Sequence, residues 1–263
     1  MLETAISAAR SAAKILMDNF GKISPDDIRR KSANDFLTFV DEEAEKKIIE
    51  TIHNKFPSHS ILAEESGLSE EAGDFEWIID PLDGTTNYIS GVPIFAVSIG
   101  VRHNKELQLG VVLDPVRNEL FFAEKSKGAF LNGKPIHVST NQNLKDCLFA
   151  TGFPFKYKEY LSTYLNCFHD IFIQCSGARR MGSAALDLSY VACGRFDFFW
   201  EIGLNPWDIA AGSLIITEAG GQVSDFWGKN SFLSNGFYTA TNGMIHHQIL
   251  EIIQRHFKSE YKR

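Results

Sequence analysis

The sequence predicts a layered α+β fold, and three features of its hydrophobic pattern support that class. Residues 2–20 and 38–55 carry apolar side chains at helical spacing. Residues 95–131 consist instead of short strand-like runs separated by turn residues. Helices and strands do not alternate regularly along the chain, which argues against a parallel Rossmann-type sheet.

The N-terminal elements have recognisable ends. Gly21 follows the helix predicted over 2–20 and is a common stop signal. The helix predicted over 38–55 is acidic at its start and basic farther on, as the helix dipole favours. A short strand is predicted over 60–63, and it leads directly into Glu64-Glu65.

The rest of the chain adds strands and helices of both kinds. An antiparallel meander is predicted, with strands at 95–102, 107–113, 119–123 and 129–131. Beyond it we expect strands at 147–151 and 196–200, a short strand pair before the last helix, and helices at 157–173, 183–193, 206–219 and 244–257. No Pro- or Ser-rich linker is present, and we place a boundary near residue 140, between an N-terminal α+β lobe (1–140) and a C-terminal α/β lobe (141–263).

Composition narrows the functional class. The 263 residues are 44% hydrophobic, which is enough for a sizeable core, and the net charge of −7 argues against a nucleic-acid or anionic-membrane surface. The scattered cysteines lack zinc-type spacing and are expected to be reduced thiols. The N-terminus does not resemble a signal peptide, and no apolar run is long enough to cross a bilayer. We therefore expect a soluble cytoplasmic protein.

The stretch from Trp77 to Asn87 carries the strongest chemical signal. An apolar run is followed by Asp80, Pro81, Leu82 and Asp83, and the strand is expected to break at the proline because proline cannot donate to a sheet. Carboxylates this close repel each other unless a cation lies between them, and Mg²⁺ prefers oxygen ligands. An isolated Asp-Gly pair is typical of a surface turn. A strand that leads directly into both acids favours a metal site.

Two other acidic motifs can reach the same sheet edge. Glu64-Glu65 follows a strand, although such a pair alone is typical of a solvated turn. Asp208 lies in the first turn of a helix that Asn205 and Pro206 open, where an acid often only caps the helix. Trp207 is bulky enough to fix the direction of Asp208.

Helix starts offer sites for an anion. Gly182 and Ser183 open the helix predicted after Arg179, and free N–H groups at a helix start bind phosphate. Ser183 can also act as a plain N-cap, and Thr85-Thr86 can open another helix. The adjacent His246 and His247 show no paired ligand spacing and are expected on the surface.

Together these motifs resemble the inositol monophosphatase family. The two long signatures are Trp77 to Tyr88 and Trp207 to Gly221, and lesser matches are Lys31 to Asn34 and Glu64 to Ser66. The resemblance implies an αβαβα layered sandwich of the inositol monophosphatase and fructose-1,6-bisphosphatase type, a homodimer, and a Mg²⁺-dependent, lithium-sensitive phosphatase. One departure is Asn205-Pro206, which stands where many members have His-Cys.

The resemblance also implies roles for individual residues. The metal ligands would be Glu64, Asp80, the Leu82 carbonyl, Asp83 and Asp208. The substrate would contact the metal-binding acids Asp83 and Asp208 and also Gly84, Thr85, Arg179, Ser183, Ala184 and Glu201. Glu64, Thr85 and Asp41 would be the catalytic residues, with Asp41, Thr85 and the attacking water forming a chain.

The main functional hypothesis is a phosphomonoesterase that hydrolyses myo-inositol monophosphate by in-line attack of water. The alternatives are a fructose-1,6-bisphosphatase or dual-activity enzyme, a nucleotidase that removes a 3′-phosphate from adenosine bisphosphate, and a binding or regulatory module without turnover. The expected partner is a small phosphorylated polyol or sugar, with no nucleic acid and no membrane.

Overall fold

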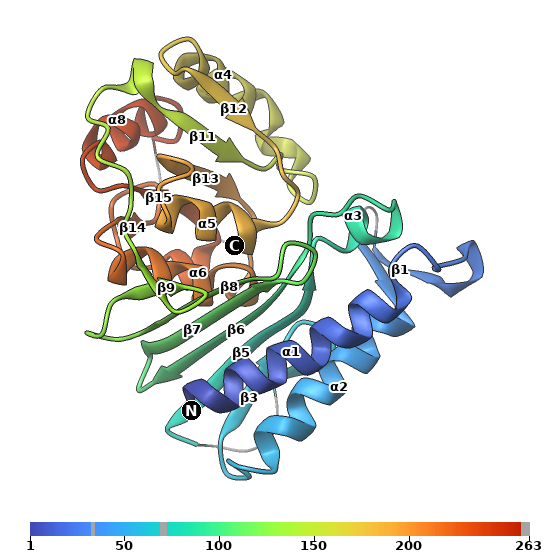
Figure 1. Cartoon of the computed structure of the whole chain (residues 1–263). Helices are drawn as coiled ribbons and strands as arrows, with labels where there is room; N and C mark the ends of the chain where they lie inside the picture. Colours follow the sequence, from blue (N-terminus) through green and yellow to red (C-terminus); the bar gives the residue numbers. More distant parts are fainter. Residues whose placement is uncertain (33–34, 69–72, 259–263) are drawn as a thin grey trace.

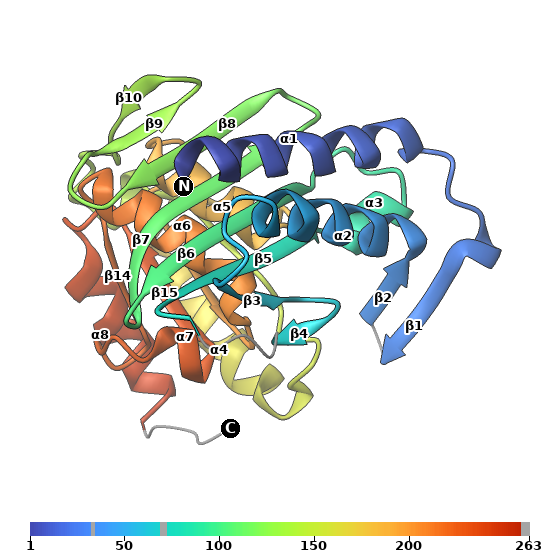
Figure 2. The ribbon, with the colours of Figure 1, turned by 90° about the horizontal axis from the view of Figure 1, so that it is seen from below.

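The computed structural model describes residues 1–32, 35–68 and 73–258, and within them helices and two sheets form alternating layers (Figure 1). One helix pair covers the outer face of the larger sheet, a second pair lies between the sheets, and a third covers the smaller sheet (Figures 1 and 2). This order is the αβαβα sandwich that the resemblance implies, and it confirms the layered α+β class that the hydrophobic pattern predicts.

The larger sheet has the strand order β10-β9-β8-β7-β6-β5-β3-β4. Its strands are β3 (Ser60–Ala63), β4 (Gly67–Leu68), β5 (Phe75–Asp83), β6 (Ala96–His103), β7 (Glu106–Asp114), β8 (Glu119–Glu124), β9 (Ala129–Leu131) and β10 (Lys134–Ile136). The predicted meander is confirmed, because β6 to β9 pair in antiparallel order. A separate antiparallel hairpin joins β1 (Ile28–Ser32) and β2 (Asp35–Thr38).

The smaller sheet has the order β12-β11-β13-β15-β14. Its strands are β11 (Leu148–Thr151), β12 (Gly177–Arg179), β13 (Phe198–Ile202), β14 (Gln222–Ser224) and β15 (Phe237–Thr241). The strand predicted at 196–200 is displaced by two residues, so Glu201 lies inside β13 and not just beyond it.

The helices complete the layers. They are α1 (Leu2–Asn19), α2 (Phe39–His53), α3 (Thr85–Ile89), α4 (Leu161–Phe172), α5 (Ala184–Ala192), α6 (Pro206–Glu218), α7 (Phe232–Asn235) and α8 (His246–His256). The pair α1 and α2 covers the larger sheet, α5 and α6 lie between the sheets, and α4 and α8 cover the smaller sheet (Figure 1). None of the described helices combines the length and apolarity that a membrane span requires.

The helix α6 approaches the larger sheet very closely because glycine lies beneath it. A Cβ atom at Gly110 of β7 would lie 2.5 Å from the backbone oxygen of Ala211. Ser98 of β6 also donates a hydrogen bond to the carbonyl of Trp207. These contacts hold the N-terminal end of α6, which carries Asp208, against the central strands. The predicted lobe boundary near residue 140 stays a prediction.

The strand β5 continues through Pro81 instead of breaking there. Asp80 pairs with Ser98 and Asp83 with Ala96, so β5 has one more residue than β6 between these pairs. Such a bulge leaves an unpaired backbone position in which proline is tolerated. The Leu82 amide donates to Asp80 Oδ1 at 3.0 Å within the bulge. The bulge therefore allows both aspartates to remain on the strand.

The prediction that His246 lies on the surface is wrong. His246 is buried, with Nε2 2.9 Å from Ser224 Oγ and Nδ1 3.1 Å from Thr241 Oγ1. The neighbouring His247 does point to solvent. Burial lowers the pKa of His246 to about 4, which keeps its imidazole neutral within the core.

Candidate active site

A cavity of about 440 Å³ lies where elements of both halves of the chain meet. One end is lined by residues at the ends of β3 and β5 and at the starts of α3 and α6. The other end is lined by residues of α5, of β13 and of the segment after β11. The lining includes Glu64, Asp83, Gly84, Thr85, Thr151, Gly152, Phe155, Lys156, Arg180, Ser183, Ala184, Asp187, Glu201, Asn205 and Asp208.

The first end gathers the acidic residues that the sequence singles out. Glu64 follows β3, and its amide donates to the Ile79 carbonyl of β5 at 3.1 Å, so both carboxyl-bearing segments lie side by side. Asp80 is 1% exposed. Burial raises the pKa of Asp80 well above its ordinary range, and the charges of Glu64, Asp83 and Asp208 raise it further. A hydrogen bond between Asp80 and Glu64 adds to the same effect.

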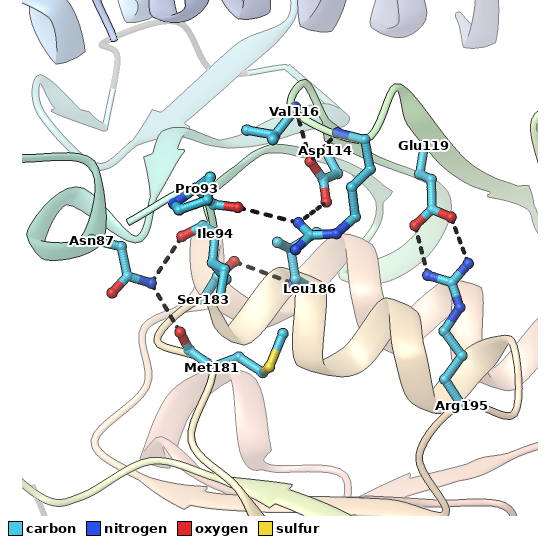
Figure 3. Close-up of polar contacts among 11 residues, drawn as sticks. Asn87, Pro93, Ile94, Asp114, Val116, Glu119, Met181, Ser183, Leu186 and Arg195 are labelled. Carbon is cyan, nitrogen blue, oxygen red and sulfur yellow. Dashed lines mark hydrogen bonds and ion pairs between the residues drawn. The ribbon is translucent and has the colours of Figure 1, made fainter. Parts of the chain in front are cut away.

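The carboxyl group of Asp83 links β5 to the start of α5. Its Oδ2 accepts hydrogen bonds from Ser183 Oγ at 2.6 Å and from the Ala185 amide at 2.7 Å. Burial raises the pKa of Asp83, and these donors oppose the rise. Ser183 also caps α5, since its Oγ accepts from the Leu186 amide (Figure 3). Ser183 therefore caps α5 and also lines the cavity, while its contact with a substrate stays a prediction.

Asp208 also combines two tasks. The Asn205 amide donates to its Oδ2 at 2.6 Å, so Asp208 caps the start of α6. Burial raises its pKa well above the ordinary value, and the charges of Asp83 and Glu64 raise it further. The capping alternative is correct, and the same carboxyl group still faces the other acids.

The acidic end has the donor chemistry of a site for a hard divalent cation. Its side-chain donors are all oxygens, the ligand type that Mg²⁺ prefers. Asp80 and Glu64 hydrogen-bond to each other, and two carboxyl groups can do so only by sharing a proton, which a cation would displace. In the part of the chain that the structure describes, no three acid, His or Cys side chains already stand in coordinating positions. Binding would therefore require these side chains to close around the ion.

Thr85 joins the acidic end to Asp41 of α2. Thr85 Oγ1 lies 3.3 Å from Asp41 Oδ1 and 3.0 Å from the Leu82 carbonyl oxygen. Asp41 is 1% exposed, and its Oδ2 accepts from both the amide and the hydroxyl of Thr38. The carboxyl group is therefore held in one orientation, and it does not lie on the solvated helix face.

The close packing of the chain just before Thr85 depends on Gly84. Gly84 has φ +100°, and a Cβ atom there would lie 3.0 Å from the Ile94 oxygen and 3.2 Å from the Gly182 oxygen. Asn87 of the same signature donates to the carbonyl groups of Ile94 and Met181, which ties α3 to the segment before α5 (Figure 3). The two sequence motifs thus form one wall of the cavity.

The far end of the cavity is built around Glu201. A Cβ atom at Gly152 would lie 2.1–2.2 Å from its carboxyl atoms, so only glycine leaves room for Glu201 in this position. Burial raises the pKa of Glu201 to about 8, and the positive charge of Arg180 opposes that shift. The guanidinium carbon of Arg180 lies 5.3 Å from the Phe155 ring centroid.

Some functional candidates differ from those that the sequence suggests. Arg179 lies in β12 and does not line this cavity, whereas its neighbour Arg180 does. Asp187 also lines the cavity and is not among the predicted residues, although it is the single charged residue in the helix 184–192, a signal that could have found it. The motif from Lys31 to Asn34 cannot be placed, because its last two residues lie outside the described residues.

Comparison with known proteins agrees with this architecture. The inositol monophosphatase family model matches residues 1–258. The chain is 47% identical to Nus factor SuhB of Escherichia coli and 45% identical to that of Pseudomonas aeruginosa, in each case over 100% of this chain and 99% of the relative.

Solved structures give the same result. The SuhB structure from Bartonella henselae has a TM-score of 0.93 at 37% identity, covering 97% of this chain and 98% of that one. The IMPase of Thermotoga maritima has a TM-score of 0.89 at 37% identity, covering 98% of each chain. The fold, both signatures and the full-length match lead to one conclusion: this chain belongs to the inositol monophosphatase family.

Proposed function

We propose that this protein is a Mg²⁺-dependent phosphomonoesterase that releases phosphate from a phosphorylated polyol such as myo-inositol monophosphate. The observation that carries the proposal is the convergence of four acids: Glu64, Asp83 and Asp208 line one end of the cavity, and buried Asp80 interacts with all three. The opposite end carries carboxyl groups and Arg180, which suit a hydroxylated leaving group.

Each residue at the acidic end has a proposed task. Glu64, Asp80, the Leu82 carbonyl, Asp83 and Asp208 would hold Mg²⁺. When bound, Mg²⁺ supplies charge that offsets the phosphate and acidifies water. The backbone amides of Gly84 and Thr85 would bind the phosphate oxygens at the start of α3. The Thr85 hydroxyl, held by Asp41, would orient the attacking water and pass on its proton.

The first experiment is a substrate panel assayed for released phosphate in Mg²⁺. It should contain myo-inositol monophosphate, fructose 1,6-bisphosphate, adenosine 3′,5′-bisphosphate and an aryl phosphate. We expect the highest kcat/KM with the inositol phosphate. A higher kcat/KM with either bisphosphate would identify that compound, and not the polyol monophosphate, as the preferred substrate. No release of phosphate from any compound would contradict the phosphatase proposal.

Glu201→Gln should separate polyol phosphates from simple ones. At a pH above about 8, where Glu201 is ionised, losing its charged hydrogen bond to a substrate hydroxyl is expected to lower kcat/KM for inositol phosphate by roughly 10- to 150-fold, or about 1.5–3 kcal/mol. Aryl phosphate turnover should change much less, since that substrate has no such hydroxyl. Equal losses of kcat/KM on both substrates would show that Glu201 does not bind a hydroxyl group of the polyol.

Gly152→Ala provides an independent test without changing Glu201. The added methyl group would occupy the position of the Glu201 carboxyl group, and we expect a loss on inositol phosphate similar to that of Glu201→Gln. Gly177→Ala is a matched control, because its nearest neighbour would be Leu148 Cδ1 at 3.4 Å, an ordinary contact. Normal inositol phosphate kinetics in Gly152→Ala would show that the Glu201 position does not matter.

The names of the relatives support a second candidate function. Several proteins 43–47% identical to this chain are named Nus factor SuhB. A Nus-factor role belongs to the class of binding or regulatory modules and needs a partner that the sequence analysis does not predict. Purification of the protein from its own cells, with identification of bound macromolecules before and after nuclease treatment, would distinguish a protein partner from a nucleic acid.

A further inference from the structure

Asp187 lines the cavity with a carboxyl group whose Oδ1 has no hydrogen-bond partner among the described residues. Its side chain is 2% exposed, and it comes from the first turn of α5. Within the described residues, its Oδ1 atom is buried and has no hydrogen-bond partner. Asp187 nevertheless lines the same cavity as Glu201 and Arg180. A buried polar oxygen of this kind is expensive to maintain in a folded protein.

Other buried aspartates in the chain are bonded. Asp225 accepts hydrogen bonds from the amides of Trp227 and Lys229 and from the side chains of Ser231 and Asn235. Asp197 likewise accepts from Ser139, Asn141 and the Leu148 amide. Those two residues organise loops, whereas no described residue donates a hydrogen bond to Oδ1 of Asp187. Asp187 itself lines a cavity that a ligand can enter.

The charges around Asp187 indicate which chemical class of ligand it can bind. Burial raises the pKa of Asp187 well above its ordinary value, and the charges of Glu201 and Asp83 add to the rise while Arg180 opposes it. A second phosphate group is disfavoured beside two carboxyl groups. A metal ion is disfavoured because the positive charge of Arg180 acts on this carboxyl group. A hydroxyl group fits, since it both donates and accepts hydrogen bonds.

We propose that Asp187 is a specificity-determining residue that binds a hydroxyl group of the polyol part of the substrate, on the α5 wall of the cavity. Glu201 lies on β13, so the two carboxyl groups come from different elements and bind different hydroxyls of one polyol. The inference rests on the proposed phosphatase function and adds a second contact to its polyol subsite.

The kinetic test uses Asp187→Asn and Asp187→Leu with inositol phosphate, a set of its monodeoxy analogues and an aryl phosphate. We expect Asp187→Leu to lower kcat/KM for inositol phosphate by about 10-fold or more, mainly through KM, and to leave the aryl phosphate nearly unchanged. One monodeoxy analogue should be hydrolysed equally by wild type and variant, because it lacks the hydroxyl that Asp187 binds. Unchanged discrimination among the analogues would overturn the inference and leave the phosphatase proposal intact.

A thermal test separates binding from structure. Removing an unpaired buried carboxyl group should raise the melting temperature of Asp187→Leu above that of the wild type. Asp225→Leu is the matched control. Its melting temperature should fall, because the substitution removes a carboxyl group that accepts hydrogen bonds from four donors. A lower melting temperature in both Asp187→Leu and Asp187→Asn would assign the residue a structural role. A wild type that hydrolyses no polyol phosphate would overturn both proposals.

Discussion

Chelation of divalent metal should abolish phosphate release, and added Mg²⁺ should restore it. The cause is the close approach of Glu64, Asp80, Asp83 and Asp208, which repel one another when no cation is present. Mg²⁺ at about 100-fold above its dissociation constant should also raise the melting temperature, on the order of 5–10 °C. The measurements are released phosphate and thermal unfolding, each in EDTA and after readdition. Full activity after exhaustive chelation would rule out the mechanism.

Metal-free protein should show a characteristic pH dependence of stability. Burial holds the folded-state pKa of Asp80 and of Asp208 above the ordinary 3.8. The folded protein then binds more protons than the unfolded chain, so its stability falls as pH rises above about 4. In EDTA the melting temperature should be higher at about pH 5 than at about pH 7, and Mg²⁺ should reduce the difference. The family resemblance adds that Li⁺ should inhibit.

Asp80→Asn provides the control for both measurements. It removes one of the repelling charges, so the metal-free variant should be at least as stable as the wild type at neutral pH. It should also lose the stabilisation by Mg²⁺ and the phosphatase activity together. A variant that kept both would show that Asp80 is not a ligand.

Thr85→Val and Asp41→Asn should each lower kcat by roughly 10²–10⁴ with smaller changes in KM. The Thr85 hydroxyl lies within reach of Asp41 and lines the cavity, so either change interrupts the same path from the attacking water. The double variant should fall well short of the product of the single effects, because the two groups act as a unit. All three are measured at saturating Mg²⁺.

A structural effect of Asp41 must be separated from a catalytic one. Asp41 also caps α2 through Thr38, so Asp41→Asn is expected to cost stability as well as turnover. Thr85→Val leaves that cap untouched and should show the catalytic loss alone. Thr217→Val, which removes an α6 hydroxyl that does not line the cavity, is the matched control. Near-normal kcat in correctly folded Asp41→Asn would exclude it from the proton path.

The sequence predicts the layers and most of the acidic end because both leave local signals. Helical spacing in 2–20 and 38–55, and the carboxylates that follow strands, can be recognised without knowing the tertiary contacts. The bulge in β5 leaves no such signal. Pro81 looks like a strand end, and only pairing with β6 shows that the strand continues.

The far end of the cavity is harder to predict for a related reason. Arg179 and Arg180 are adjacent and chemically identical, so only the path of the chain after β12 decides which one lines the cavity. His246 likewise has buried hydroxyl partners from β14 and β15, which no helical pattern reveals. The role of Gly152 depends on the position of Glu201, nearly fifty residues away in the chain.

Two of the acids in the site also cap helices, so their presence in a sequence is not by itself evidence of catalysis. Asp41 caps α2 by accepting from Thr38, and Asp208 caps α6 by accepting from Asn205. A relative that had given up turnover would still be selected to keep both acids, since losing either would loosen the start of a helix. Asp80 has no comparable duty at a helix start: it accepts from the Leu82 amide within β5 and shares a hydrogen bond with Glu64. Among these acids, Asp80 is therefore the position whose replacement would distinguish a relative that has lost catalysis from an active enzyme.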